Sequence, residues 1–259
     1  MKQKIILFKN SEMASTWVAN YFNDYIKKNP KAVLGFATGV SPLLTYKLLQ
    51  KYSKEGTSWE GITSFNLDEF VGVPVEHPES FKVQMMNNLF NGVNIKKENI
   101  LLPNGLAEDP KIEADKYEKL IKSKGGIDLQ YISLGANGHM AYNEPGTSLK
   151  TLTHVAELED FTRKVLVEQK KFPTYDETPK NAITVGVETI MKFKEMIMVS
   201  LGESKAEPTK KMLEGPITSD IPSSALQKHK NTVFVLDEGA SKLLDLSKFE
   251  VEDLRDYKG

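Results

Sequence analysis

Short apolar runs alternate with longer amphipathic segments along most of the chain. The apolar runs are typical of buried strands, and they lie at residues 4–8, 32–36, 62–65, 128–134, 195–201 and 232–236. Between them, apolar residues recur at helical spacing at residues 12–28, 42–52, 80–90, 112–122 and 204–213. Strands separated by helices of this length form βαβ units. The pattern therefore predicts an α/β fold with a mainly parallel sheet and helices on both faces.

One stretch, residues 151–180, breaks this alternation. It is polar and charged and contains Pro173 and Pro179. No linker rich in Pro, Gly or Ser divides the chain, and no internal repeat is present. We therefore expect residues 1–259 to form a single domain, with a lid-like insertion around residues 151–180.

The composition excludes several classes of protein. The 34 Lys and Arg residues balance 35 Asp and Glu residues, which is unlike a strongly basic nucleic-acid-binding protein. The chain has no cysteine, so disulfides, thiolate metal sites and cysteine nucleophiles are excluded. The apolar stretches are too short for a membrane span or a signal peptide, and the four histidines lack the paired spacing of metal ligands. We expect a cytoplasmic protein with no metal and with neither nucleic acid nor membrane as a partner.

Four loops that follow predicted strands carry polar residues, and such loops meet at the carboxyl edge of a parallel sheet, where ligands bind. The first loop, residues 35–42, contains two glycines followed by Ser41 and Pro42, which suit the N-cap and the first position of a helix. Its backbone amides and the helix N-terminus favour an anion such as phosphate. An ordinary strand-to-helix turn would show the same pattern.

Adjacent carboxylates occupy the second loop, at Asp68 and Glu69. Side chains alternate along an extended segment, so only one of the two is expected to face a pocket. A carboxylate in that place suits a general base, with its basicity raised by burial, and a cap on the next turn is the alternative role. His77 precedes Pro78, and we expect it to cap a turn or to touch the edge of a substrate site.

The third loop, residues 135–146, is the most informative. It contains three glycines, a proline, His139 and Glu144. A plain connection does not need so many residues of special backbone freedom. A histidine can transfer a proton in either direction near neutral pH, and Glu144 or Asn137 would fix its tautomer and orientation.

The fourth loop, residues 200–207, again connects a strand to a helix. Ser204 and Glu207 match a capping box. Lys205 would then lie in the first helical turn, where its charge opposes the helix dipole unless an anion binds there. A solvated surface lysine is the alternative.

Taken in order, these loops resemble the glucosamine-6-phosphate deaminase family, also called glucosamine-6-phosphate isomerases. The resemblance covers nearly the whole chain, and its most specific motifs are LGFATGVSP (34–42), FNLDEFVGVPVEHPESF (65–81), LGANGHMAYNEPGTS (134–148), AITVGVETI (182–190) and LGESKA (201–206). It implies a doubly wound, Rossmann-like domain that uses neither a cofactor nor a metal, and a hexosamine phosphate as the small-molecule partner.

The resemblance also implies the reaction, in which an amino-sugar phosphate and water give fructose 6-phosphate and ammonia. Asp68 would take the proton from C2. His139, positioned by Glu144 and Asn137, would move a proton at the ring oxygen to open the sugar. The residues implied in substrate binding are Thr38, Gly39, Val40, Ser41, Glu69, Gly138, Lys171 and Lys205. The loop at residues 38–41 and Lys205 would hold the phosphate.

Three positions depart from the family pattern. Asn137 stands where many members have Asp, and a neutral partner stabilises a protonated histidine less. Val40 occupies a loop position where a small residue is common. The family's phosphate-binding Arg has no clear counterpart; Lys171 is the nearest substitute by context, with Lys170 beside it, and a lysine cannot form a bidentate guanidinium contact.

These departures leave the epimer of the substrate open. Glucosamine 6-phosphate is the leading hypothesis, and galactosamine 6-phosphate, which would use the same base and histidine, is the close alternative. A 6-phosphogluconolactonase is more distant, because lactone hydrolysis gives the Asp68 loop no evident task. A sugar-phosphate sensor without turnover is the non-enzymatic alternative. The sequence also leaves open whether the chain forms a homo-oligomer.

Overall fold

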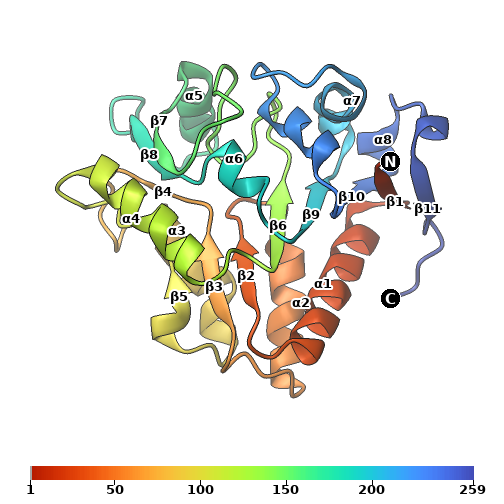
Figure 1. Ribbon diagram of the computed structural model, residues 1–259, viewed down its shortest axis with the longest axis horizontal. Coiled ribbons are helices and arrows are strands. Elements are labelled where there is room, and N and C mark those ends of the chain that lie inside the picture. Colours follow the sequence, from red (N-terminus) through yellow and green to blue (C-terminus); the bar gives the residue numbers. More distant parts are fainter. Residues whose placement is uncertain (1) are drawn as a thin grey trace.

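Eight strands form one sheet through the centre of the molecule (Figure 1). The structure is a computed structural model that describes residues 2–259. From edge to edge the strands are β11 (Glu250–Asp253), β1 (Lys4–Phe8), β10 (Thr232–Asp237), β9 (Glu195–Ser200), β6 (Leu129–Ser133), β2 (Val33–Phe36), β3 (Thr63–Asn66) and β5 (Ile100–Leu101). Every pair of neighbours is parallel, so the predicted α/β fold is confirmed.

The helices connect these strands or follow them. They are α1 (Ser11–Lys28), α2 (Leu43–Lys54), α3 (Phe81–Asn88), α4 (Pro110–Ser123), α5 (Asp160–Glu168), α6 (Val187–Ile190), α7 (Ala206–Glu214) and α8 (Glu238–Ser241). The first begins where its sequence predicts, because the Asn10 side chain accepts the N–H of Met13 and caps the helix. Within residues 2–259, no helix has the length and apolar character needed to cross a membrane.

Helices cover both faces of the sheet. Along β9, Met196 and Met198 pack in a core shared with α4 and α7, whereas Ile197 and Val199 pack in a core shared with α1 and α2. Because successive side chains of a strand point to opposite faces, a strand buried on both faces is apolar at nearly every position. This is why the central strands appear in the sequence as continuous apolar runs.

A second sheet of three antiparallel strands lies beside the first, at the upper left of Figure 1. Strand β4 (Asp68–Phe70) pairs with β8 (Asn181–Thr184), and β8 pairs with β7 (His154–Glu157). A separate apolar core joins this small sheet to α3 and α5. The sequence analysis missed the sheet because strands this short show no measurable periodicity. Residues 151–180, which we expected to form an insertion, contain β7 and α5.

The strand order reverses between β2 and β6. From β2 the chain continues through β3 and β5 towards one edge, and from β6 it continues through β9 and β10 towards the other. Loops that diverge from such a switch point leave a crevice at the carboxyl ends of the strands. The loops that follow β3 and β9 reach the same side of the sheet, because all these strands are parallel.

The predicted start of the second helix is wrong. Helix α2 begins at Leu43, and no side chain caps it, so Ser41 is not its N-cap. The chain makes a tight turn instead, in which the N–H of Leu43 donates to the carbonyl of Val40. This backbone bond satisfies one of the free donors at the helix start and leaves the Ser41 hydroxyl available.

The capping box predicted for α7 is not formed either. A single 3₁₀ turn, Glu203–Lys205, precedes α7, and no side chain caps the helix that begins at Ala206. The N–H of Lys205 donates to the carbonyl of Gly202, so the turn is closed through the backbone rather than through Ser204 and Glu207.

The segment before α3 agrees better with the expectation. His77 accepts the N–H of Glu79 at its Nδ1 atom, 3.1 Å away, and so caps this turn. Its ring stacks on Phe172, with the ring centroids 5.2 Å apart. Ser80 then caps α3 by accepting the N–H of Val83.

Glu118 of α4 joins the insertion to the helices of the main sheet. Its Oε2 atom accepts the N–H of Thr153, 3.1 Å away, and the hydroxyls of Thr153 and Thr189, and its Oε1 atom lies 3.1 Å from the Lys122 ammonium. Burial raises the pKa of Glu118, but these hydrogen bonds together outweigh burial and hold the pKa below its usual value. The ionised carboxylate therefore stabilises this junction.

We expect Glu118→Gln to lower the free energy of unfolding at pH 7 by about 1–3 kcal/mol, because an amide nitrogen would face a group of donors. A carboxyl whose pKa is lower in the folded than in the unfolded state stabilises the fold at pH values above its unfolded pKa. This contribution is lost as the pH falls through its folded pKa. Urea unfolding should therefore show a larger deficit at pH 7 than at pH 3. Asp115→Asn, an exposed carboxylate on the same helix, is the control and should match the unsubstituted protein. A deficit of equal size at both pH values would contradict the role of the charge.

Candidate active site

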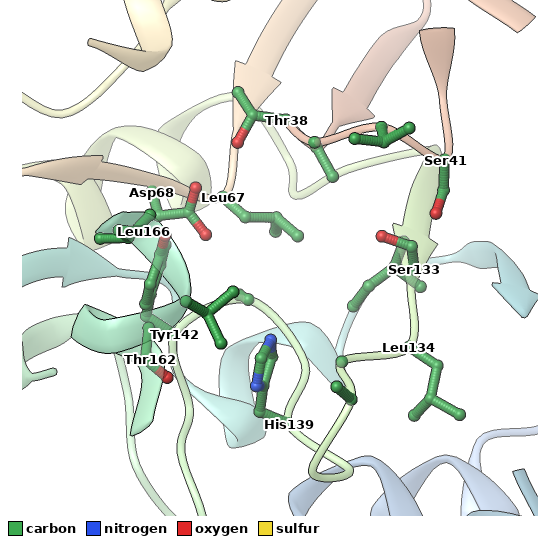
Figure 2. A pocket seen from close by; sticks show the side chains of 18 of the residues that line it. Thr38, Ser41, Leu67, Asp68, Ser133, Leu134, His139, Tyr142, Thr162 and Leu166 are labelled. Carbon is green, nitrogen blue, oxygen red and sulfur yellow. The ribbon is translucent and has the colours of Figure 1, made fainter. Parts of the chain in front are cut away.

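A cavity of about 360 Å³ lies at the carboxyl ends of the strands, at the switch point of the sheet. Its walls are formed by the loops after β2, β3, β6 and β9, together with α5. Asp68 and His139 point into it from different sides, and Thr38 and Ser41 lie along another wall (Figure 2). The tertiary structure thus brings together loops that are far apart in the sequence, from Ala37 to Lys205.

Asp68 lies immediately after β3 and is the first residue of β4. Its backbone is held by pairing with Thr184 of β8, and its side chain is only 6% exposed. The described residues donate no hydrogen bond to its carboxylate. Burial first, and then the charge of Glu69, raise the pKa of Asp68 to about 8. Asp68 is therefore a carboxylate of unusually high basicity that faces a cavity, as a general base requires.

Glu69 is placed differently, and the structure does not bring it to this cavity. Its carboxylate accepts the N–H groups of Phe70, Phe81 and Lys82, and so it binds the first turn of α3. Burial raises the pKa of Glu69, and these backbone bonds act in the opposite direction. The two carboxylates face different places: Asp68 lines the cavity at the switch point, whereas Glu69 lines a separate pocket. The expectation that only one of them faces a pocket is therefore wrong, and so is the expectation that Glu69 lines the same cavity as Asp68. The alternation of the strand sends its side chain to the opposite face.

His139 is held by a chain of hydrogen bonds that leads away from the cavity. Its Nδ1 atom contacts Oδ1 of Asn137 at 2.5 Å, and Nδ2 of Asn137 donates to Oε2 of Glu144 at 2.9 Å. The other oxygen of Glu144 accepts the hydroxyl of Thr162, from α5. Because the Asn137 oxygen can only accept a hydrogen bond, the neutral ring carries its proton on Nδ1 and its lone pair on Nε2, the nitrogen that points into the cavity in Figure 2.

Glu144 is 5% exposed and does not itself line the cavity. Burial raises the pKa of Glu144, but the hydrogen bonds and charge of His139, with the hydrogen bonds of Thr162 and Asn137, lower it below its usual value. An ionised Glu144 lies 3.4 Å from the Nδ1 atom of His139 and stabilises that ring when it gains a proton. Asn137 and Glu144 thus orient His139 from behind rather than facing the cavity.

Two glycines shape the loop around this histidine. A Cβ atom at Gly135 would lie 2.2 Å from the His139 ring, so only glycine leaves room for the ring. Gly138 has a φ of +89° and packs against Ile221. Gly138 is therefore a turn residue. We expected it to bind substrate, but it does not line the cavity.

Two lysines, Lys171 and Lys205, line the same cavity as the loop at residues 38–41. The ammonium of Lys205 donates to the carbonyl of Leu134, 2.8 Å away, and burial lowers the pKa of Lys205. Lys171 follows α5, and its N–H donates to the carbonyl of Leu166. Val40 stands at the cavity mouth and is 75% exposed. The predicted phosphate-binding residues therefore do share one cavity with Asp68 and His139.

Several residues of the cavity wall were missed by sequence reasoning. They are Ser133 at the end of β6, Tyr142 in the His139 loop, Phe161, Thr162, Val165 and Leu166 of α5, and Gln169 directly after α5. Tyr142 could have been predicted, because it stands in the same loop as His139, three residues later. The α5 residues had no such signal, since a polar stretch does not show which neighbour it packs against.

The arrangement suits proton transfer on a small anionic molecule. One buried base and one imidazole face the same cavity, and two ammonium groups lie on its wall. Among residues 2–259, no three His, Asp or Glu side chains are grouped so that they could hold a metal ion.

Comparison with known proteins gives a consistent result. The family model described as glucosamine-6-phosphate isomerases/6-phosphogluconolactonase matches residues 9–235. A glucosamine-6-phosphate deaminase of Mycoplasmopsis pulmonis (strain UAB CTIP) is 46% identical over 245 residues, which cover 94% of this chain and 96% of that protein. A glucosamine-6-phosphate deaminase of Clostridium perfringens (strain 13 / Type A) is 42% identical, with coverages of 93% and 99%.

Solved structures extend the comparison. A monomeric glucosamine-6-phosphate deaminase superimposes with a TM-score of 0.89 at 38% identity, covering 93% of this chain and all of that one. A 6-phosphogluconolactonase from Trypanosoma cruzi superimposes with a TM-score of 0.75 at 20% identity over 94% of this chain and 97% of that one, a likeness of fold alone. By sequence and by fold, this chain belongs to the family of glucosamine-6-phosphate isomerases and 6-phosphogluconolactonases.

Proposed function

We propose that the protein is a glucosamine-6-phosphate deaminase, which converts glucosamine 6-phosphate and water into fructose 6-phosphate and ammonia in amino-sugar catabolism. The names of the relatives at 46% and 42% identity support this activity. The observation that carries it is Asp68, a buried carboxylate of raised pKa that shares a cavity with His139. A reaction that begins with removal of a proton from carbon needs a base of this kind.

Ring opening is the first step, and His139 performs it. The Nε2 atom takes the proton from the C1 hydroxyl and returns a proton to the ring oxygen, which breaks the C1–O5 bond and leaves an aldehyde. The imidazolium that forms in between is stabilised by Asn137 and the ionised Glu144 behind it. The hydroxyl of Thr162 donates a hydrogen bond to the other carboxylate oxygen of Glu144 and so holds Glu144 in place.

Isomerisation follows, and Asp68 performs it. Its carboxylate removes the proton from C2, the electron pair forms the C1–C2 double bond of an enolamine, and the aldehyde oxygen takes up a proton from water to become a hydroxyl. Protonation at C1 gives an imine at C2, and addition of water there releases ammonia and leaves the ketone. Burial and the charge of Glu69 raise the pKa of Asp68, and the stronger base favours the first proton transfer.

The phosphate group binds between the loop at residues 38–41, Lys205 and Lys171. This binding lies away from the reacting carbons and holds C1 and C2 against Asp68. The lid-like role proposed for the insertion rests on the same contacts. Helix α5 contributes Thr162 to the cavity wall, and the segment that follows it contributes Lys171.

A lactonase is the less suitable alternative. Hydrolysis of a lactone needs a water molecule activated by a histidine but no base at C2, so the buried Asp68 would have no task in it. The likeness to lactonase structures is one of fold, at 20% identity. Galactosamine 6-phosphate differs from the proposed substrate only at C4, and the same base and histidine would act on it.

Ammonia release from the two epimers, measured on the purified protein under identical conditions, tests the proposal. We expect kcat/KM for glucosamine 6-phosphate to exceed that for galactosamine 6-phosphate by at least about tenfold. The C4 hydroxyl of the galacto epimer would be misplaced, and one misplaced hydroxyl in a fitted site costs on the order of 1–3 kcal/mol. A larger kcat/KM for the galacto epimer would reassign the substrate. Tight binding of both sugars without any ammonia would indicate a sensor.

Asp68→Asn should reduce kcat by about 10²–10⁴-fold while substrate affinity changes little, because the amide keeps the shape and removes the base.

The same variant should change the pH dependence of stability. A carboxyl whose pKa is higher in the folded than in the unfolded state destabilises the fold once the pH exceeds its unfolded pKa, and this destabilisation reaches its full size above its folded pKa. The variant should therefore melt at a higher temperature than the unsubstituted protein at pH 9, with a smaller difference at pH 5. Glu69→Gln provides the contrast: it should lower the melting temperature and keep turnover. Full turnover in Asp68→Asn would remove Asp68 from the mechanism.

The pH dependence of kcat/KM should report the same group. Only the ionised form of Asp68 is a base, so kcat/KM should rise with pH through about 8, the pKa of Asp68. Measurement above pH 7 avoids the second ionisation of the substrate phosphate, which lies near 6. A flat profile between pH 7 and pH 9, in protein that remains folded, would contradict the assignment.

A further inference from the structure

The turn that carries Lys205 begins at Gly202, and its geometry is demanding. Gly202 has a φ of +88°, and the N–H of Lys205 closes the turn on the Gly202 carbonyl. From this turn the Lys205 ammonium reaches the carbonyl of Leu134 and the cavity wall. The position of the ammonium therefore depends on how firmly this turn is held.

Asp237 holds the turn from behind. It is the last residue of β10 and is 5% exposed. Both of its carboxylate oxygens accept the N–H of Gly202 at 2.9 Å, and Oδ1 also accepts the N–H of Ala240 at 2.8 Å. One carboxylate thus joins the start of the Lys205 turn to the start of α8. Charge-assisted bonds of this kind are stronger and shorter than neutral ones.

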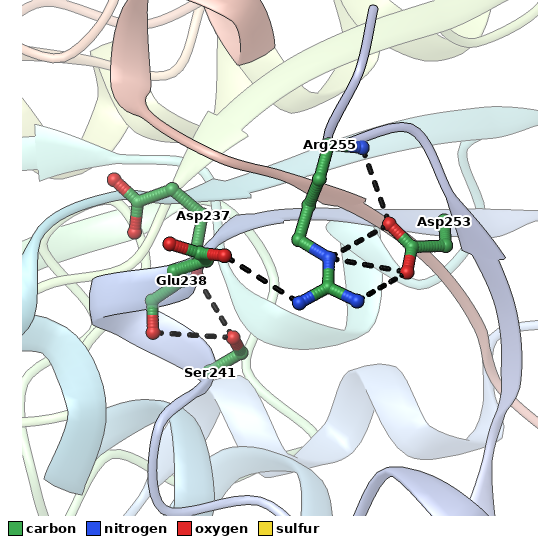
Figure 3. Close-up of polar contacts among 5 residues, drawn as sticks. All are labelled: Asp237, Glu238, Ser241, Asp253 and Arg255. Atoms are coloured by element: carbon green, nitrogen blue, oxygen red, sulfur yellow. Dashed lines mark hydrogen bonds and ion pairs between the residues drawn. The ribbon is translucent and has the colours of Figure 1, made fainter.

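Other charged groups nearby do not share this contact. Arg255 binds Asp253 and Glu238 on the surface, and the Asp237 carboxylate points away from this cluster in Figure 3. The Arg255 cluster is exposed, with side chains about half accessible. Asp237 is therefore committed to two backbone amides, and it is not among the residues that line the cavity.

Close packing of α8 also holds this turn in place. A Cβ atom at Gly239 would lie 2.8 Å from the nitrogen of Glu203 and 3.0 Å from the carbonyl carbon of Gly202. Helix α8 therefore contacts the turn directly, backbone against backbone. A side chain at this position would push the turn away from β10.

We propose that Asp237 is a positioning residue for the phosphate site: by holding the Gly202 turn against α8, it sets the place of the Lys205 ammonium on the cavity wall. The inference rests on the proposed function only in that the anion held by Lys205 is the phosphate of the sugar. Asp237 does not face the cavity and takes no part in proton transfer. Displacing a binding group by about 1 Å is enough to weaken its contact severely.

Asp237→Asn tests the inference. The amide puts a donor opposite the Gly202 N–H, so the turn should shift and Lys205 should lose its place. We expect KM for glucosamine 6-phosphate to rise about tenfold with kcat changed less than about threefold, since binding remote from the reacting carbons is lost. The dissociation constant for inorganic phosphate, measured by calorimetry, should rise by a similar factor.

Two further variants separate positioning from general damage. Asp253→Asn makes the same change of charge in the Arg255 cluster without touching the turn, and both constants should stay at their original values. Gly239→Ala disturbs the turn from the other side and should raise both constants as Asp237→Asn does. If Asp237→Asn is unfolded at the assay temperature, the Gly239→Ala result decides.

Unchanged phosphate binding in folded Asp237→Asn or in Gly239→Ala would overturn the inference, and so would a loss confined to kcat. Failure of the proposed function looks different: the unsubstituted protein would then release no ammonia. Calorimetry with inorganic phosphate would still compare Asp237→Asn with Asp253→Asn in that case.

Discussion

The buried carboxylate of Asp68 is the constraint on which the rest of the site depends. A carboxylate without hydrogen bonds is costly inside a protein, and its pKa of about 8 measures that cost. The surrounding structure must therefore impose its position. Strand β3 leads directly into β4, and the antiparallel pairing of β4 with β8 fixes the backbone of Asp68. Glu69, one residue on, has three backbone donors and helps to hold this segment in place. Two adjacent carboxylates thus have opposite roles, one in chemistry and one in structure.

The small antiparallel sheet and α5 are part of the site. Thr162 of α5 binds Glu144, and Glu144 leads through Asn137 to His139. Glu118 attaches the start of this region to α4 and α6. The segment that interrupts the alternation of strands and helices therefore supplies part of the orienting network as well as a wall of the cavity. Its movement would alter both the cavity and the orientation of the histidine.

Deaminases and lactonases share this fold, and the difference between them lies in side chains carried by the loops. Likeness at 20% identity establishes the sheet order and nothing about the reaction. Within this chain, the loops at the carboxyl ends of β2, β3, β6 and β9 all contribute residues to one cavity. The sheet brings these loops together, and their sequences determine which chemistry is carried out. In the proposed mechanism, Asp68 is the group that removes a proton from carbon, a step that simple hydrolysis does not need.

The sequence by itself determined the parallel sheet, its covered faces and the approximate bounds of most strands and helices, because burial of a strand on both faces leaves a continuous apolar run. Motif order also identified Asp68, His139 and the loop at residues 38–41, which the fold places on one cavity. The tertiary structure alone decided that Glu69 binds the first turn of α3 and that Gly138 packs on Ile221. It also decided the place of α5 and the small sheet, whose short strands have no periodicity of their own. These features depend on which side of a segment faces which neighbour, and that is settled by contacts between residues far apart in the chain.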